Sequence, residues 1–286
     1  MAADPLKAVM VGLRNHAGTL DPQKGHGLLK SFKAHPDVEV VAYCEWDPAE
    51  AAALAAVGAA DPTARLYANI DELLHNESFD FATIMLPPNE TTPTALRLAA
   101  AGKHLFIEKQ AAQTAEELAP LRALTQQQRL VVQIDYPWPS HPVAQALKHH
   151  IDGGDLGRLV AMEARLVTLG VGPGLRDPQH WMYRKTGQGG GILHMEGGHW
   201  LTLFHYFTGA RVRSVTALCN RVIGNIEAGL EDVATVALEF TNGVHALLHM
   251  GYLLPGVGPR NDTFFALRGT QGVASWPTPG NGEYTI

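Results

Sequence analysis

The sequence predicts two domains: an α/β domain with a doubly wound parallel sheet, then an α+β domain with a largely antiparallel open sheet. In the first half of the chain, short apolar runs alternate with helical patterns, which is typical of a parallel sheet covered by helices. After about residue 137, longer strands with alternating polar and apolar side chains follow one another. This change of pattern predicts domains at residues 1–136 and 137–286.

Five compact apolar runs are the expected strands of the first domain, because strands buried on both faces consist of nearly continuous hydrophobic residues. They cover residues 7–11, 38–44, 80–86, 104–107 and 130–134. Helical patterns separate them, at residues 25–35, 48–57, 70–75, 92–101 and 114–127.

The second domain begins with a helix at residues 142–151, which Gly153 and Gly154 end. Alternating strands are expected at residues 159–169, 212–220, 232–240, 245–253 and 263–267, with one helix among them at residues 197–206. The tripeptide Thr241-Asn242-Gly243 joins two of these strands and is a strong hairpin signal. We therefore expect most strand pairs in this sheet to be antiparallel.

Composition and charge limit the function classes. The chain has 22 Lys and Arg against 28 Asp and Glu, a net charge of −6, which argues against nucleic acid or an anionic membrane as the main partner. Cys44 and Cys219, the two cysteines, lie in apolar runs that we expect to be buried strands, so a reducing, cytoplasmic location is expected. No apolar stretch approaches the ~20 residues of a membrane span, and the first twelve residues lack a signal-peptide layout.

The turn after the first strand partly matches a dinucleotide-binding loop. Gly12 and Ala17 fit the first and third small positions of that loop, but Arg14 stands at the second. Residues 18–24 resemble an insertion before the helix. The segment is therefore either an enlarged phosphate loop, with Gly12, Arg14 and Asn15 as candidate cofactor contacts, or an ordinary strand-to-loop turn.

Glu45 stands at the end of the second strand, where an acid accepts hydrogen bonds from a ribose diol and repels a 2′-phosphate. This predicts NAD rather than NADP, although Arg14 could attract a phosphate and keeps NADP possible. The alternative is a helix-capping or solvated acid. Asp47 is the better candidate for the cap, because Pro48 follows it at a first-turn position.

Four segments carry a family resemblance. Residues 38–45 end in Glu45; then come Leu86-Pro87-Pro88-Asn89, residues 101–109 with Glu108-Lys109, and Gly189-Gly190-Gly191 with His199 beyond. Together they resemble the glucose–fructose oxidoreductase / inositol dehydrogenase family (Gfo/Idh/MocA) over nearly the whole chain.

The resemblance implies an N-terminal Rossmann domain with bound NAD(P), a C-terminal open-sheet domain and a homodimer or homotetramer formed through the sheet face. It implies an NAD(P)-dependent oxidoreductase that acts on a sugar, cyclitol or related polyol. Relatives commonly continue for several strands beyond the equivalent of residue 286, so the chain is expected to be either naturally short or incomplete at its C-terminus. The implied cofactor contacts include Pro87, Pro88, Asn89, Glu108 and Lys109.

The same segments also contain departures from the family pattern, so the chain resembles a divergent member of that family. The family's Glu-Lys-Pro is Glu108-Lys109-Gln110 here, Thr92 replaces a histidine, and Met195 stands where the family's Asp-x-x-x-His pair has its aspartate. The loss leaves two alternatives open: a lyase, hydrolase or epimerase that uses a tightly bound NAD without net redox change, or a catalytically inactive nucleotide- or ligand-binding protein.

Lys109, His199 and Glu196 are the candidate catalytic residues. The resemblance implies that Lys109 contacts the reacting oxygen, and a cation there stabilises developing negative charge. His199 can act as a general base near neutral pH. Because Glu196 lies three residues before His199, it can take over the role of the missing aspartate if both are on a helix.

Other side chains near this segment suggest further roles. Of His194, Glu196, His199 and His205, only Glu196 and His199 share one helix side, so no metal site is expected. Trp138, Trp181 and Tyr183, together with Trp200, are candidates for a sugar-facing aromatic wall or, alternatively, for the core.

Overall fold

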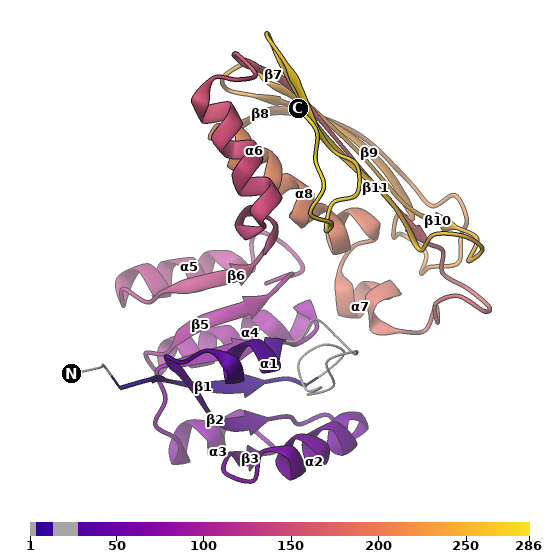
Figure 1. Ribbon diagram of the computed structural model, residues 1–286. Coiled ribbons are helices and arrows are strands. Elements are labelled where there is room, and N and C mark those ends of the chain that lie inside the picture. Colours follow the sequence, from indigo (N-terminus) through magenta and orange to yellow (C-terminus); the bar gives the residue numbers. More distant parts are fainter. Residues whose placement is uncertain (1–3, 14–27) are drawn as a thin grey trace. The chain divides into compact units, whose positions relative to one another are not determined.

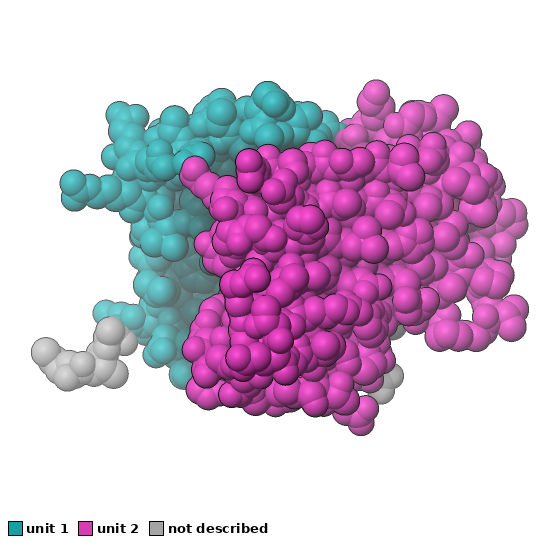
Figure 2. All heavy atoms as spheres, turned by 90° about the horizontal axis from the view of Figure 1, so that it is seen from above, with its two compact units in different colours: residues 1–135 teal, residues 136–286 magenta. Residues whose placement is uncertain are grey.

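The computed structural model describes residues 4–13 and 28–286, and the chain forms two compact units, Met1–Asp135 and Tyr136–Ile286 (Figures 1 and 2). Arg14, Asn15 and the segment 18–24 lie outside the described residues. Each unit has its own sheet and its own hydrophobic core.

The first unit contains a six-stranded sheet in the order β3-β2-β1-β4-β5-β6, with every neighbouring pair parallel. This is the strand order of the doubly wound dinucleotide fold, so the predicted fold class is confirmed. The strands are β1 (Leu6–Val11), β2 (Val38–Cys44), β3 (Arg65–Tyr67), β4 (Phe81–Ile84), β5 (His104–Glu108) and β6 (Val132–Asp135).

Helices connect these strands (Figure 1): α1 (Leu28–Ala34), the 3₁₀ turn η1 (Pro48–Glu50), α2 (Ala51–Ala60), α3 (Ile70–Asn76), α4 (Pro88–Ala100) and α5 (Leu118–Gln127). Because side chains alternate along a strand, Val9 and Val11 of β1 belong to one core cluster and Met10 to another. The first cluster includes residues of α3, α4 and α5, the second residues of α1 and α2. Helices therefore cover both faces of the sheet.

Several elements of this unit differ from the sequence prediction: α5 begins at Leu118 rather than at residue 114, and α2 ends at Ala60 rather than at residue 57. Strand β3 was not predicted, because its three residues form a short, largely exposed edge strand without a buried apolar run. Helix α4 begins at Pro88 rather than at residue 92, since Pro88 at its first turn has the backbone angle that a helix start requires.

The second unit contains a six-stranded sheet in the order β12-β11-β7-β10-β9-β8. Its neighbours are antiparallel except for β7 and β10, as the predicted largely antiparallel sheet requires. The hairpin at Thr241-Asn242-Gly243 joins β9 and β10, and Gly243 has a φ of +81°. The strands are β7 (Leu159–Leu169), β8 (Val212–Asn220), β9 (Val233–Phe240), β10 (His245–Leu254), β11 (Asn261–Gly269) and β12 (Val273–Trp276).

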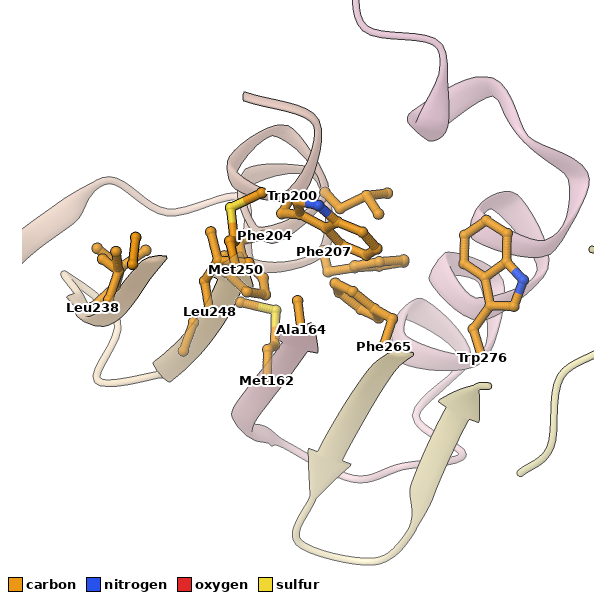
Figure 3. Close-up of a cluster of buried hydrophobic side chains, with 14 of the residues drawn as sticks. Met162, Ala164, Trp200, Phe204, Phe207, Leu238, Leu248, Met250, Phe265 and Trp276 are labelled. Atoms are coloured by element: carbon orange, nitrogen blue, oxygen red, sulfur yellow. The ribbon is translucent and has the colours of Figure 1, made fainter. Parts of the chain in front are cut away.

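Helix α8 packs on this sheet through an aromatic core (Figure 3). Its Phe204 and Phe207 lie 5.7 and 5.4 Å from the Phe265 ring of β11, and all three are buried. Burying one such side chain contributes about 1.5–3 kcal/mol, so this contact fixes the helix on the sheet. The helical elements of the unit are η2 (Trp138–Ser140), α6 (Pro142–Gly153), η3 (Trp181–Tyr183), α7 (Lys185–Gln188) and α8 (Ile192–Thr208).

Helix α8 begins five residues before the predicted start at residue 197, which places Glu196 and His199 in its interior. The Gly197-Gly198 pair masked the helical pattern because glycine disfavours helices by about 1 kcal/mol relative to alanine.

The expectation that both cysteines are buried is wrong for Cys219. Cys44 in β2 is buried, whereas Cys219 lies on β8, the outermost strand of its sheet, where every residue is exposed. The apolar run of β8 therefore does not mark a core strand. No helix in the described part of the chain is both long and apolar enough to cross a membrane.

Candidate functional site

The first unit gathers predicted cofactor residues at the carboxyl ends of its strands. The strand order reverses between β1 and β4, and ligands of such sheets bind at that reversal. Gly12 follows β1 there with a φ of +84°, and its N–H donates to the Cys44 carbonyl at 2.9 Å. A Cβ at this position would lie 2.5 Å from the Met85 carbonyl oxygen, so only glycine fits between the two strand ends.

Glu45 lies beside this turn and is only 3% exposed. Its Oε2 accepts the Leu13 N–H at 2.8 Å, and its Oε1 accepts the N–H groups of Trp46 and Asp47, both at 2.9 Å. Both carboxylate oxygens therefore have backbone partners. Burial, and then the Glu45 charge, raise the pKa of the neighbouring Cys44 thiol to about 12, which keeps that thiol protonated.

Asp47 caps the following turn, as its position before Pro48 suggested: its Oδ1 accepts the Ala49 N–H at 2.9 Å. The Trp46 indole N–H donates to the Glu90 carboxylate of α4 at 3.0 Å. This bond connects the segments that follow β2 and β4, the two strands that flank β1. Sequence analysis did not identify Trp46 or Glu90, which are 44 residues apart.

The segment after β4 leads directly into α4. Pro87 and Pro88 are buried, whereas Asn89 in the first turn is exposed. The Thr91 hydroxyl donates to the carbonyl oxygens of Leu86 and Pro87, so it fixes the entry of the chain into the helix.

Lys109 and Glu108 lie at the carboxyl end of β5, the neighbour of β4. Both side chains are half-buried, and the Lys109–Gln110 peptide bond is cis. Thr92, at the position of the family's histidine, donates its hydroxyl to the Ala111 carbonyl at 2.9 Å. This bond attaches α4 to the segment that follows Lys109.

In the second unit, helix α8 brings Glu196 and His199 together. The Glu196 Oε2 and His199 Nε2 atoms are 3.9 Å apart, and the two side chains are 29% and 15% exposed. Met195 is buried, and its thioether cannot supply a carboxylate. The helix therefore presents one acid and one imidazole side by side.

A glycine of α8 lets an aromatic ring approach this pair. The rings of Tyr136 and Trp138 meet His199 edge-on, with centroids at 5.7 and 6.2 Å. A Cβ on Gly198 would lie 2.7 Å from the Tyr136 ring, so glycine at this helix position is what admits the tyrosine. Gly197 in turn packs beneath Leu193 and near Met250.

Glu231, which sequence analysis did not identify, holds the start of α8. Its carboxylate accepts the N–H groups of Gly191 and Leu193, each at 3.0 Å, and its carbonyl accepts that of Ile192. A carboxylate at a helix N-terminus accepts hydrogen bonds from free N–H groups and is attracted by the positive end of the helix dipole. A Cβ on Gly191 would lie 1.8 Å from the Glu231 carbonyl oxygen, which explains the third glycine of the triple glycine.

The aromatic candidates occupy different surroundings. The Trp138 ring stacks on the Trp200 ring, with centroids 6.1 Å apart, so Trp138 contacts both the core and His199. Tyr183 is buried and meets Tyr252 edge-on at 5.5 Å. Burial raises the pKa of the Tyr183 hydroxyl, the Glu196 charge adds to this, and Arg176 opposes it. Tyr183 therefore lies within electrostatic range of Glu196.

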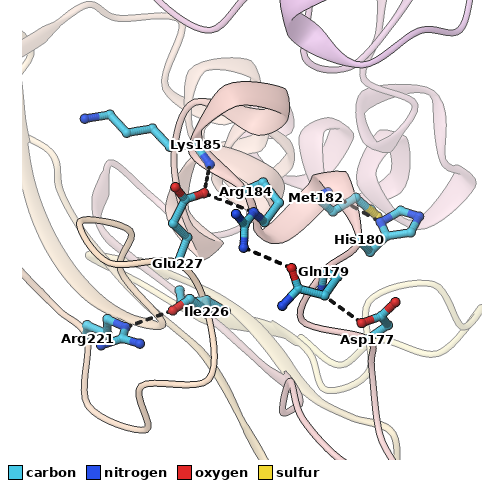
Figure 4. A network of polar contacts seen from close by, with 9 residues as sticks. All are labelled: Asp177, Gln179, His180, Met182, Arg184, Lys185, Arg221, Ile226 and Glu227. Carbon is cyan, nitrogen blue, oxygen red and sulfur yellow. Dashed lines mark hydrogen bonds and ion pairs between the residues drawn. The ribbon is translucent and has the colours of Figure 1, made fainter.

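The Trp181 ring lies beside the His180 ring, with centroids 5.5 Å apart, and among the described residues it makes no ring contact with His199. Its segment is tied to the loop before β9 by Glu227, which accepts the Lys185 N–H at 2.7 Å and pairs with Arg184 (Figure 4). In the described residues no group of three His, Cys, Asp or Glu side chains is arranged to hold a metal ion.

Comparisons with known proteins agree with this architecture. A family model described as an oxidoreductase family with an NAD-binding Rossmann fold matches residues 6–136, and a GFO/IDH/MocA C-terminal domain matches residues 144–275. A 1-carboxy-3-chloro-3,4-dihydroxycyclohexa-1,5-diene dehydrogenase of Comamonas testosteroni is 26% identical over 228 residues, covering 79% of this chain and 55% of that protein. The chain spans about half the length of the curated relatives it matches.

Solved structures show the same fold at low sequence identity. An aldose–aldose oxidoreductase from Caulobacter crescentus superposes with a TM-score of 0.81 at 20% identity, covering 98% of this chain and 78% of that chain. A putative myo-inositol dehydrogenase from Sinorhizobium meliloti gives a TM-score of 0.77 at 20% identity, covering 94% and 75%.

Proposed function

Because the chain belongs to the Gfo/Idh/MocA oxidoreductase family, whose N-terminal domain is an NAD-binding Rossmann fold, we propose that it is an NAD-dependent oxidoreductase that acts on a CH–OH group. Its substrate is a sugar, a cyclitol or a related polyol. The names of similar proteins support this class, since they include a dihydroxycyclohexadiene dehydrogenase, an aldose oxidoreductase and an inositol dehydrogenase.

The described residues of the first unit fit NAD. Gly12 provides the tight turn after β1, and the segment Pro87-Pro88-Asn89 lies across the strand-order reversal at the start of α4. The family's N-terminal domain binds NAD, and Asp47 is an acid beside the turn that disfavours a 2′-phosphate, so NAD is preferred to NADP. The first unit is thus the dinucleotide-binding domain and the second the substrate domain.

The observation that carries the proposal is the Glu196–His199 pair on α8, at 3.9 Å. The imidazole takes the hydroxyl proton while the carboxylate stabilises the imidazolium that forms. The Lys109 ammonium stabilises the negative charge that develops on the substrate oxygen. Bound NAD supplies the hydride acceptor. Trp138, Trp181 and Tyr183 are proposed substrate contacts, of which Trp138 and Tyr183 lie close to the pair.

Met195 favours a second candidate function. A buried thioether at the position of the family's aspartate weakens proton transfer, which suits a lyase, hydrolase or epimerase that regenerates its bound NAD. A non-catalytic ligand-binding protein is the third possibility.

The test is to mix the protein with NAD and a panel of sugars and cyclitols at alkaline pH. Growth of absorbance at 340 nm with at least one substrate supports the oxidoreductase. Product without NADH supports the second candidate, and saturable ligand binding without product supports the third.

We also propose that the protein is a homo-oligomer, a dimer or a tetramer. Two apolar side chains on the sheet face that points away from α8, Leu218 of β8 and Leu247 of β10, are 69% and 43% exposed, and an exposed apolar sheet face is a surface that a second copy of the chain can cover. Light scattering at micromolar concentration tests this, and a 30.8 kDa particle would contradict it.

A further inference from the structure

We propose that Glu45 is a positioning residue: its carboxylate holds the Gly12–Leu13 turn against the segment that follows β2, and it does not bind the ribose of the cofactor. This inference rests on the proposed function, because the turn is where the dinucleotide binds. It assigns to Glu45 a different task from the one that an acid at this strand end suggests.

The hydrogen bonds of Glu45 are the first argument. A carboxylate offers about four lone-pair positions, and three backbone N–H groups fill most of them here. Both oxygens take part, and hydrogen bonds to an ionised acceptor are stronger than neutral ones. A ribose diol needs two adjacent acceptor positions, and this carboxylate does not offer them.

Burial is the second argument. Glu45 is 3% exposed, so its oxygens face the protein rather than a ligand. A residue that reads the 2′-position must present its charge at an open surface, where a hydroxyl or a phosphate can approach.

The structure of the turn is the third argument. Gly12 already contacts the end of β4, and the Leu13 side chain is 3% exposed within the core cluster that α1 and α2 cover. The Leu13 N–H is therefore a buried donor, and Glu45 is its acceptor at 2.8 Å. Without this acceptor the donor is left unsatisfied, which costs enough free energy to loosen the turn.

The test compares Glu45→Gln with the parent protein. The amide keeps the side-chain length but removes the charge and directs an N–H₂ group toward backbone N–H groups. We expect amide hydrogen exchange at Leu13 in the cofactor-free protein to accelerate about tenfold or more, the scale of losing a hydrogen bond to a charged group. We expect the Kd values of NADH and NADPH to rise by about the same factor, with their ratio unchanged within about threefold.

A ribose-reading Glu45 would give the opposite pattern. NADH would then bind more weakly and NADPH more tightly, while Leu13 exchange would stay at the parent rate. That outcome overturns the proposal. If the parent binds neither nucleotide, the proposed function fails, whereas the Leu13 exchange rate still decides whether Glu45 holds the turn.

Two further variants complete the test. Glu39→Gln removes an exposed carboxylate from the same strand, β2, and is expected to change neither exchange nor affinity. Glu45→Asp keeps the charge, but its side chain is shorter and its carboxylate lies farther from the Leu13 N–H. Because the charge is kept, this variant is the replacement if Glu45→Gln fails to fold. It is expected to accelerate Leu13 exchange and to leave the NADPH-to-NADH ratio unchanged, and a changed ratio would contradict the proposal.

Discussion

In each unit a glutamate side chain accepts hydrogen bonds from a glycine-containing turn. The two glutamates differ in the kind of element that brings them to the turn. Glu45 bonds to Leu13 across two neighbouring parallel strands, β1 and β2, whose carboxyl ends meet at one sheet edge. Glu231 bonds to Gly191 and Leu193 from a loop 40 and 38 residues further along the chain. In the first unit the strand order produces the contact, whereas in the second it depends on how a long loop packs against a helix start.

The comparison separates two parts of the proposed chemistry. The first unit supplies the cofactor edge and Lys109, and the second supplies the Glu196–His199 pair. Variants in either unit therefore test whether these parts act as assigned.

The largest effect is expected for Lys109→Ala. Removing a positioned charge that stabilises the reacting oxygen lowers turnover by about 100-fold or more. The Kd for NADH and the thermal midpoint change little, because the side chain is half-buried at a strand end. Turnover close to that of the parent would remove Lys109 from the reacting site.

Next in size is Glu231→Ala, which tests the attachment of α8. Two helix-terminal N–H groups lose a charged acceptor, so we expect a loss of about 2 kcal/mol in unfolding free energy and a fall of about 5 °C in Tm. Differential scanning calorimetry measures both. Glu227→Ala is the matched control in the same loop: it frees one backbone N–H, of Lys185, and is expected to shift Tm less. Equal decreases in Tm for the two variants would show that the Glu231 cap of α8 does not stabilise the fold more than the Glu227 contact does.

Glu196→Gln addresses the proton-transfer pair. We expect activity to fall by about tenfold, in the range that general acid–base assistance contributes. The acid limb of the pH–rate profile moves to lower pH, because a nearby carboxylate favours the imidazolium form and its removal favours the free base. Met195→Leu, nearly volume-conserving, is the control and leaves the profile in place. An unchanged profile in Glu196→Gln would leave His199 unassisted.

The smallest effect concerns stability rather than catalysis. Burial alone would raise the pKa of Asp61, but hydrogen bonds from Lys33, Tyr43 and Thr63 outweigh it, so the pKa is lowered. A lowered folded-state pKa means that Asp61 stabilises the fold above the unfolded-state value of about 3.9, and this contribution disappears as pH falls through the folded-state pKa.

Urea unfolding of Asp61→Asn measures that contribution. We expect the variant to be less stable than the parent by about 1 kcal/mol at pH 7, with the difference shrinking below about pH 4. A difference that is the same at pH 7 and pH 3 would show that the ionised carboxylate is not what stabilises this cluster.

The fold could be predicted from the sequence wherever one local pattern decided it. The apolar run at residues 38–44 and the alternating pattern at residues 159–169 became β2 and β7 with the predicted bounds, because each pattern is local and typical of its kind of strand. The short edge strand β3 has no such pattern. The edge strand β8 has an apolar run although all of its residues are exposed, so Cys219 was misplaced.

The candidate site divides in the same way. Glu196 and His199 were paired from their spacing on one helix, which fixes their separation. Glu231 and the Trp46–Glu90 bond join residues distant in sequence, and no local signal indicates them. Glu45 was located correctly at a strand end, but which way its carboxylate points is decided by backbone donors that a sequence pattern does not show.

Isotope transfer tests the central claim most directly. A substrate found in the polyol panel is prepared with deuterium on the carbinol carbon and incubated with the protein and NAD, and the nucleotide is then isolated and weighed by mass spectrometry. The account predicts reduced nucleotide carrying one deuterium, formed in proportion to the oxidised product. Oxidised product accompanied by nucleotide that carries no deuterium would contradict it.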